Sequence, residues 1–252
     1  MTYSVALAGK GGTGKTTLAS LIIRFLSSEG KVPILAVDAD PNANLAEGLG
    51  LEVKQTVGMM LATFIEEKFD FPQGMSKDAY IEYRLNELLV ESEDVDLLVM
   101  GRGEGSGCYC YPNIVLRKYI DILTKNYSYV VLDNEAGMEH VSRRLSDHID
   151  LMLLVSDYSI KGVRTAGRIR NLVEELKLEI GQQYFVINRT PEVLDTNLRE
   201  EVERQRLNFL GMVPVDEKVY EYDLEGMPLI NLPDNSKAVK TVNELMSKVI
   251  LN

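Results

Sequence analysis

Continuous apolar runs, bounded by glycine or polar residues, recur along the chain and predict seven buried strands. The runs lie at 3–8, 33–37, 95–100, 129–132, 151–155, 183–187 and 209–213. Because the apolar positions are continuous rather than alternating, both faces of each strand are expected to be covered. This pattern is typical of the strands of a parallel sheet.

Segments with a helical spacing of apolar residues lie between these strands. They cover 18–26, 113–125, 160–176, 194–205 and 236–251, and helical spacing also runs through 43–92 with a break at 71–74. The alternation predicts an α/β fold, a mostly parallel central sheet with helices on both faces. No linker rich in proline, glycine or serine divides the chain, so one domain is expected over residues 1–252. Residues 52–92 contain no chemical motif and are the expected partner surface.

The stretch from Gly9 to Thr17 joins the first strand to the first helix and reads G-K-G-G-T-G-K-T-T. The spacing G-x-x-x-x-G-K-T in that context is the spacing of a phosphate-binding P-loop. Its backbone N–H groups are expected to face phosphate, with Lys15 at the β- and γ-phosphates and the Thr16 hydroxyl at Mg²⁺. We therefore predict a P-loop NTPase whose nucleotide contacts are Gly11, Gly12, Thr13, Gly14, Lys15, Thr16 and Thr17.

Acidic residues follow two of the predicted strands. Asp38 and Asp40 come after the second strand, and Asp133 comes after the fourth. In open α/β sheets the carboxyl ends of the strands meet at one edge, where ligands bind. We therefore expect these carboxylates to face the phosphates, with Thr16, Asp38 and Asp133 around Mg²⁺.

The chain is acidic, with a formal net charge of −11 and a sequence pI of about 4.8. Affinity for nucleic acid rests on clustered Lys and Arg, so no nucleic-acid partner is expected. No apolar run reaches the roughly 18 residues of a membrane span, and no signal-peptide pattern is present. We expect a cytoplasmic protein with no membrane partner.

Lys10 lies directly after the first glycine, so the loop resembles the deviant Walker A motif of the MinD/ParA-like dimeric ATPases. The resemblance implies ATP or ADP with Mg²⁺, and a nucleotide-dependent homodimer in which Lys10 reaches the nucleotide of the other subunit. It also implies that Asp40 orients or deprotonates the attacking water, so that Lys10, Lys15 and Asp40 are catalytic. By the same resemblance, adenine is expected near Asn188, Pro214 and Asp216.

Only two cysteines occur, Cys108 and Cys110, in a glycine-rich loop. Their spacing is poor for an intrachain disulfide. With the segments 133–140 and 226–229, this loop resembles the nickel-insertion accessory ATPases of carbon monoxide dehydrogenase and acetyl-CoA synthase. The resemblance implies a metal bound between two subunits, since one C-x-C pair from each supplies four thiolates. Ni²⁺ follows from the resemblance, whereas four sulfur ligands alone are more typical of Zn²⁺ or an iron–sulfur centre.

The hypothesis is an ATP-dependent metallochaperone that hydrolyses ATP to insert nickel into carbon monoxide dehydrogenase or acetyl-CoA synthase. Two alternatives stay open: a MinD/ParA-like positioning ATPase without metal cargo, and an iron–sulfur reductase resembling the nitrogenase iron protein. The acidic charge and the cysteine pair disfavour the first. The close spacing of the cysteines disfavours the second, because that relative uses cysteines far apart in sequence. A small-molecule kinase remains conceivable, since a P-loop alone establishes only phosphate binding.

Overall fold

The computed structural model describes residues 2–40, 42–66, 74–101, 119–134, 148–191 and 193–251. Within these ranges one seven-stranded sheet has the order β3-β2-β4-β1-β5-β6-β7, and all neighbouring strands are parallel. The predicted fold class is confirmed. The strands are β1 (Tyr3–Gly9), β2 (Ile34–Asp38), β3 (Val95–Val99), β4 (Tyr129–Asp133), β5 (His148–Ser156), β6 (Glu179–Thr190) and β7 (Phe209–Pro214).

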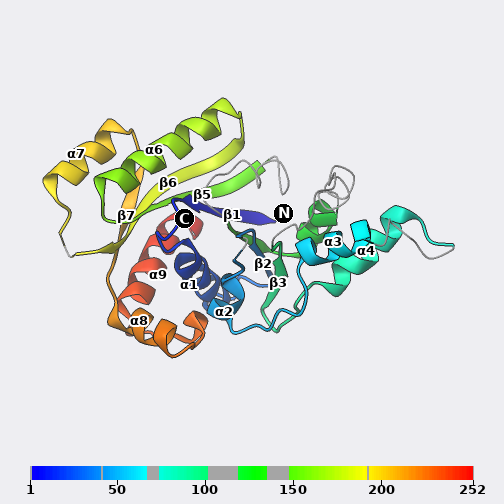
Figure 1. Cartoon of the computed structure of the whole chain (residues 1–252). Coiled ribbons are helices and arrows are strands. Elements are labelled where there is room, and N and C mark those ends of the chain that lie inside the picture. Colours follow the sequence, from blue (N-terminus) through cyan, green and yellow to red (C-terminus); the bar gives the residue numbers. More distant parts are fainter. Residues whose placement is uncertain are drawn as a thin grey trace.

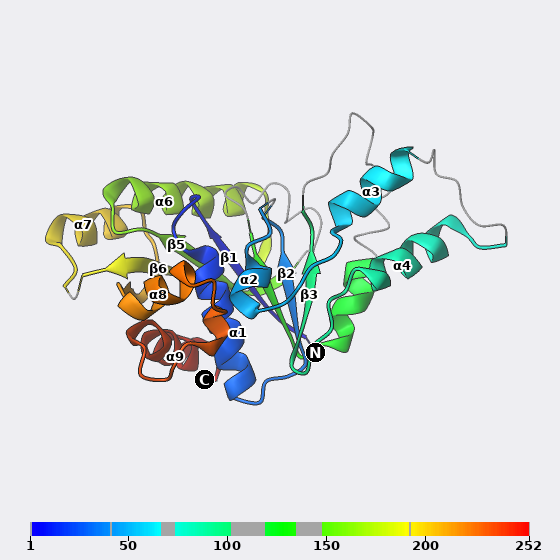
Figure 2. The ribbon, with the colours of Figure 1, turned by 60° about the horizontal axis from the view of Figure 1, so that its bottom comes forward.

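Helices cover both faces of the sheet (Figures 1 and 2). One apolar cluster joins the sheet to α1 (Lys15–Ser28), α2 (Leu45–Leu49) and α9 (Lys237–Ile250). The other cluster joins the opposite face to α3 (Val57–Glu66), α4 (Lys77–Glu87), α6 (Ile160–Glu175) and α7 (Thr196–Arg204). Successive strand residues alternate between the two clusters, as in Leu7 and Ala8 of β1. The sheet is therefore buried on both sides, which explains its continuous apolar runs.

Several expected helices differ in extent from the prediction. The helix expected at 113–125 is described from residue 119, with helical residues at 119–123 and a 3₁₀ turn, η1 (Thr124–Asn126). The region 43–92 contains three helices, α2, α3 and α4, and most of its predicted break lies outside the described residues. Two further elements, α8 (Glu217–Leu224) and the 3₁₀ turn η2 (Leu229–Asn231), were not predicted. No helix in the described ranges is long and apolar enough to cross a membrane.

The strand register places the predicted acidic residues side by side. Asp38 at the end of β2 is the direct neighbour of Asp133 at the end of β4. Asp133 in turn is the neighbour of Leu7 in β1, the strand that leads into the P-loop. The carboxyl ends of these three central strands therefore bring the P-loop and both carboxylates to one edge of the sheet.

Candidate functional site

The P-loop conformation requires glycine at two positions. A Cβ atom on Gly9 would lie 2.1 Å from the carbonyl oxygen of Val155, so β1 and β5 approach too closely there for any side chain. Gly14 caps the N-terminus of α1 in the left-handed conformation, with φ of 84°, and a Cβ there would lie 2.3 Å from Asn188 Nδ2. A left-handed backbone is strained for residues other than glycine. The motif spacing is thus explained by backbone geometry and close packing.

Hydrogen bonds inside the loop hold it closed around the Lys15 side chain. The buried Lys15 Nζ donates to the carbonyl oxygens of Gly9 at 3.2 Å and Lys10 at 3.4 Å. Thr13 Oγ1 donates to the same Lys10 carbonyl at 2.9 Å. The Lys10 ammonium forms no ion pair with any residue that the structure describes. Lys15 therefore lies inside the loop, whereas Lys10 is only half-buried at its edge.

Two adjacent residues at the end of β6 hold the P-loop through hydrogen bonds to its backbone carbonyls. Asn188 Nδ2 donates to the Thr13 carbonyl at 3.0 Å, and Arg189 Nη1 donates to the Gly12 carbonyl at 3.4 Å. Asn188 Oδ1 accepts from the Arg189 backbone N–H at 2.9 Å, and Arg189 has a positive φ of 55°. The predicted adenine contact Asn188 thus also shapes the loop. Sequence reasoning gave Arg189 no role, because nothing but its place after Asn188 marks it.

Asp133 is placed against the first turn of α1. Its Oδ2 accepts a hydrogen bond from Thr16 Oγ1 at 2.6 Å. Its Oδ1 is buried and has no hydrogen-bond partner among the residues that the structure describes. Burial raises the pKa of Asp133 to about 6, although the Thr16 hydroxyl and the Lys15 ammonium act in the opposite direction. A buried carboxylate oxygen without a donor is costly, so this site favours a cation.

Asp38 lies beside it but has a different set of partners. It is fully buried, and its oxygens accept from the backbone N–H groups of Asp40 at 3.0 Å and Leu45 at 2.9 Å. Burial raises the pKa of Asp38 to about 7, with the neighbouring Asp133 adding to the rise. The geometry shows Asp38 holding the loop between β2 and α2. A contact of Asp38 with Mg²⁺ stays a prediction.

Asp40 is held at the mouth of the site. Its Oδ1 accepts from the backbone N–H of Asn42 at 2.9 Å and from Asn42 Nδ2 at 3.0 Å. The same residue lines a cavity of about 820 Å³ together with the P-loop. This is within the range of small-molecule sites in proteins. The cavity is also lined by Tyr222, Asp223, Gly226, Met227, Pro228 and Leu229, none of which was predicted to contact nucleotide.

A second cavity of about 420 Å³ adjoins the first, and Thr17, Arg189, Asp223 and Leu229 line both. All three predicted adenine contacts, Asn188, Pro214 and Asp216, line this second cavity.

The carboxylate of Asp216 already serves a structural purpose within that cavity. It caps α8 by accepting from Lys218 N at 3.0 Å, and it accepts from Ser236 Oγ at 2.6 Å and Ala238 N at 2.9 Å. Burial alone would raise the pKa of Asp216, but these hydrogen bonds hold it below its usual value. Asp216 thus joins α8 to α9 behind the cavity. Its role at adenine stays a prediction.

The predicted thiolate site lies outside the described residues, since Cys108 and Cys110 fall within 102–118. In the described ranges, no group of three or more His, Cys, Asp or Glu side chains could hold a metal ion. Asn134, which follows Asp133, is fully buried, and within the described part of the chain neither its amide nitrogen nor its amide oxygen has a hydrogen-bond partner.

Comparisons with known proteins agree with this fold and loop. Residues 4–229 match the CobQ/CobB/MinD/ParA nucleotide binding domain. An uncharacterized ATP-binding protein of Methanocaldococcus jannaschii is 43% identical, over 98% of each chain. The carbon monoxide dehydrogenase accessory protein CooC of Rhodospirillum rubrum is 28% identical, over 90% of this chain and 89% of that protein. The structure of the septum site-determining protein MinD from Pyrococcus horikoshii, complexed with Mg-ADP, has 23% identity and a TM-score of 0.73, covering 99% of this chain and 96% of that chain.

The matched residues include the P-loop, both strand-end aspartates and most of the residues that line the second cavity, and the fold agrees over nearly the whole chain. The chain therefore belongs to the CobQ/CobB/MinD/ParA nucleotide binding domain family.

Proposed function

We propose that this protein binds Mg-ATP in the two adjoining cavities and hydrolyses it. The observation that carries the proposal is the Thr16–Asp133 pair, in which a hydroxyl and a carboxylate lie 2.6 Å apart and the second carboxylate oxygen is buried without a donor. Hard oxygen donors of this kind fit Mg²⁺, which Thr16 and Asp133 would hold. Mg²⁺ bound between Thr16 and Asp133 would neutralise negative charge on the phosphates.

The side chains around the phosphate position have separate tasks in this proposal. Lys15, enclosed by the loop, offers its ammonium to the β- and γ-phosphates. Asp40 faces the same cavity and positions the attacking water, while the buried Asp38 fixes the backbone that carries Asp40. Lys10 has no carboxylate partner in the described structure, so it is available to reach a nucleotide in a second subunit.

A trans-acting lysine requires a homodimer that closes around the nucleotide. Cations delivered in this way stabilise charge that develops on the transferred phosphoryl group, with effects on the order of 10³–10⁵ in rate. We therefore propose that ATP favours the dimer. Hydrolysis then relaxes the loop that carries Asp40.

We further propose that the cargo of this ATPase is nickel, held by Cys108 and Cys110 of both subunits, with zinc as the competing occupant. Support comes from the accessory protein CooC, whose sequence is similar to 90% of this chain. The C-x-C spacing of the two cysteines also supports it. Two thiolates per subunit hold a metal weakly, whereas four across a two-fold axis complete a tetrahedral set. Dimerisation and metal binding then stabilise each other. The client is carbon monoxide dehydrogenase or acetyl-CoA synthase.

Nickel transfer into the client tests this proposal. Nickel-free carbon monoxide dehydrogenase and acetyl-CoA synthase of the same organism are incubated anaerobically with the nickel-loaded protein and Mg-ATP, and nickel in each enzyme is measured after separation. We expect transfer to one of them with ATP and little with a non-hydrolysable analogue. Equal transfer from free Ni²⁺ without the protein would contradict the proposal and favour a positioning ATPase.

A further inference from the structure

Helix α6 presents a row of exposed cations in an otherwise acidic chain. Lys161, Arg164 and Arg168, here called the basic stripe, follow one another at spacings of three and four residues, so they share one helix face. Residues 158–173 contain no Asp or Glu, although the chain holds 38 acidic residues. Within the helix, none of the three stripe residues therefore has an Asp or Glu three or four residues away, whereas Arg170 does, in Glu174 at 3.8 Å.

The arrangement opposes the stability of the helix. The first turn of α6 contains no acidic residue and its last turn no basic residue. Because a helix N-terminus has partial positive charge, a cation at Lys161 in the first turn is unfavourable. Like charges three and four residues apart also repel. The stability of α6 itself therefore gives no reason for the basic stripe.

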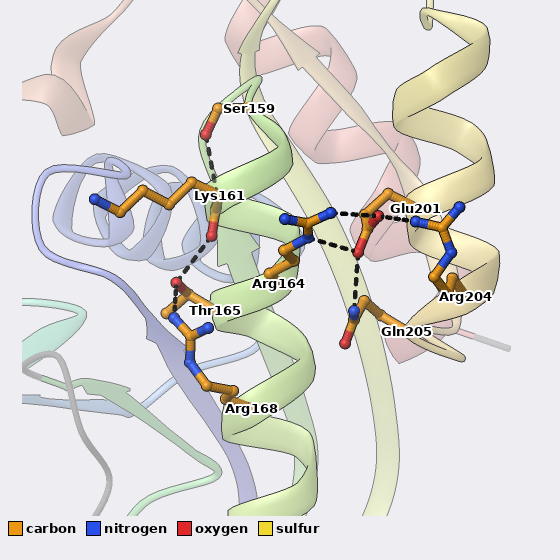
Figure 3. A network of polar contacts seen from close by, with 9 residues as sticks. Ser159, Lys161, Arg164, Thr165, Arg168, Glu201, Arg204 and Gln205 are labelled. Carbon is orange, nitrogen blue, oxygen red and sulfur yellow. Dashed lines mark hydrogen bonds and ion pairs between the residues drawn. The ribbon is translucent and has the colours of Figure 1, made fainter.

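One buried carboxylate on α7 balances part of this charge. Glu201 is 3% exposed and accepts from Arg164 Nε at 3.0 Å and from Arg204 Nη1 at 2.5 Å, whereas those two side chains are 53% and 63% exposed. Figure 3 shows Arg164 turned toward Glu201 and Lys161 turned away from it. Glu201 thus fixes the two guanidinium groups at the surface, and a single negative charge serves both.

The other two members of the stripe have no such counterion. Arg168 donates to Thr165 Oγ1 at 2.8 Å, and neither Arg168 nor Lys161 forms an ion pair with a residue that the structure describes. On α6, two exposed cations of the stripe thus have no acidic partner among the described residues. On α7, Arg204 shares Glu201 with Arg164, and the exposed Glu200 and Glu203 lie within four residues of it in sequence. An acidic partner is complementary to such a surface, and charge complementarity of this kind speeds association and selects the partner.

The stripe begins at the nucleotide edge of the sheet. Helix α6 follows β5, and Val155 of β5 is the register neighbour of Gly9 in the P-loop strand. A Cβ on Gly162 would lie 2.2 Å from Ser156 Oγ, so the first turn of α6 is tightly packed on the end of β5. The end of the stripe that carries Lys161 therefore lies at the P-loop edge of the sheet.

We infer that the exposed face of α6, with Arg204 of α7, is a docking surface for an acidic face of a partner protein. Naming that partner as the nickel enzyme rests on the proposed function above. The inference that this surface binds an acidic protein rests on the charges, burial and position of the residues named above.

The test uses two charge-reversed proteins with the same net charge. Lys161→Glu/Arg168→Glu changes the stripe and spares the Arg164–Glu201 pair. The matched control is Lys237→Glu/Lys240→Glu, two exposed lysines in the first turn of α9 on the opposite face of the sheet. Fluorescent poly-L-glutamate, a DNA duplex, carbon monoxide dehydrogenase and acetyl-CoA synthase are titrated with each protein, with Mg-ATP and at two salt concentrations.

We expect wild type to bind poly-L-glutamate in a salt-sensitive manner, the stripe variant to bind about tenfold more weakly, and the control to stay within about twofold. ATP hydrolysis should be unchanged in both variants. The docking surface would be overturned if wild type and the stripe variant bound poly-L-glutamate equally, or if both variants lost the same affinity. It would also be overturned if wild type did not bind poly-L-glutamate. Tighter binding of DNA than of poly-L-glutamate would overturn the assignment to a protein partner.

The enzyme titrations separate this inference from the proposed function. If the stripe variant alone loses affinity for poly-L-glutamate and also for one nickel enzyme, the docking surface and the proposed client are both supported. If the stripe variant loses affinity for poly-L-glutamate while wild type binds neither enzyme, the docking surface is supported and the proposed client is wrong.

Discussion

Thr16 Oγ1 donates to Asp133 Oδ2 at 2.6 Å, and this contact joins the first turn of α1 to the end of β4, 117 residues further along the chain. The parallel register that makes Asp133 the neighbour of Leu7 creates the contact. It brings together a P-loop hydroxyl and a strand-end carboxylate that the sequence places far apart.

Replacing Thr16 with alanine should weaken Mg-dependent nucleotide binding. The variant removes one of two oxygen donors, so we expect about a tenfold lower affinity for Mg-ADP and little change when EDTA is present. Isothermal titration with and without Mg²⁺ measures the difference. Ser20→Ala is the control, because the Ser20 hydroxyl donates to the Thr16 carbonyl within α1. An equal loss with EDTA would mean that Thr16 does not act through the cation.

Asp40→Asn should retain ATP binding and lose hydrolysis. The amide cannot accept a proton from water, and loss of a general base typically lowers the rate by about a hundredfold or more. Phosphate release under saturating ATP measures the rate, and fluorescent-nucleotide titration measures binding. Asp223→Asn, which changes another carboxylate at the same cavity, should hydrolyse ATP far better than Asp40→Asn. A near-normal rate in Asp40→Asn would remove Asp40 from the mechanism.

Gly14→Ala should abolish nucleotide binding and destabilise the fold. The new methyl meets Asn188 Nδ2 at 2.3 Å and the backbone has φ of 84°, so steric overlap adds to backbone strain of about 1–2 kcal/mol. Gly30→Ala isolates the strain alone, since φ there is 64° and no atom lies within 4 Å. Chemical denaturation compares the two variants. Equal losses of stability would show that the contact with Asn188 contributes nothing.

The Glu201 network should make stability depend on pH in a defined direction. Hydrogen bonds from Arg164 and Gln205 hold the pKa of Glu201 below its usual value, despite burial. Its folded pKa is thus below the unfolded one, so its contribution is complete above about pH 4.3 and is lost as pH falls through the folded pKa.

Glu201→Gln should therefore melt at a lower temperature than wild type at pH 7, and the difference should shrink as pH falls below about 4. Thermal melts across this range test it, with the exposed Glu203→Gln on the same helix as the control. A difference between Glu201→Gln and wild type that is constant with pH would contradict an ionic role for Glu201.

Much of the fold could be predicted because strands buried on both faces leave continuous apolar runs. β6 begins before its predicted start at residue 183 because early residues such as Glu179 and Gln182 are polar and exposed. Helix α8 was missed because none of its residues is buried, and its Tyr220 and Leu224 are 68% and 73% exposed. Apolar periodicity predicts helices that bury a face in a core, whereas α8 contacts the core only through the partly buried Val219 and Tyr222.

The site was predictable where a local motif defines it and unpredictable where tertiary structure assembles it. The P-loop follows from spacing alone, and strand ends located Asp38 and Asp133. The hydrogen bonds from Asn188 and Arg189 to the carbonyls of Thr13 and Gly12 join residues 175 and 177 positions apart, and no local pattern encodes them. The cavity wall at 222–229 likewise arises from the way α8 and η2 fold back over the P-loop.

The central claim is that nucleotide-driven dimerisation assembles a thiolate site for nickel. Light scattering combined with nickel and zinc analysis, on anaerobic protein with and without Mg-ATP, tests it most directly against Cys108→Ser/Cys110→Ser. The account predicts about one metal ion per dimer in wild type, and loss of that metal in the double variant while ATP binding survives. A dimer that forms with ATP but never holds metal would contradict it and leave a nucleotide switch without a cargo.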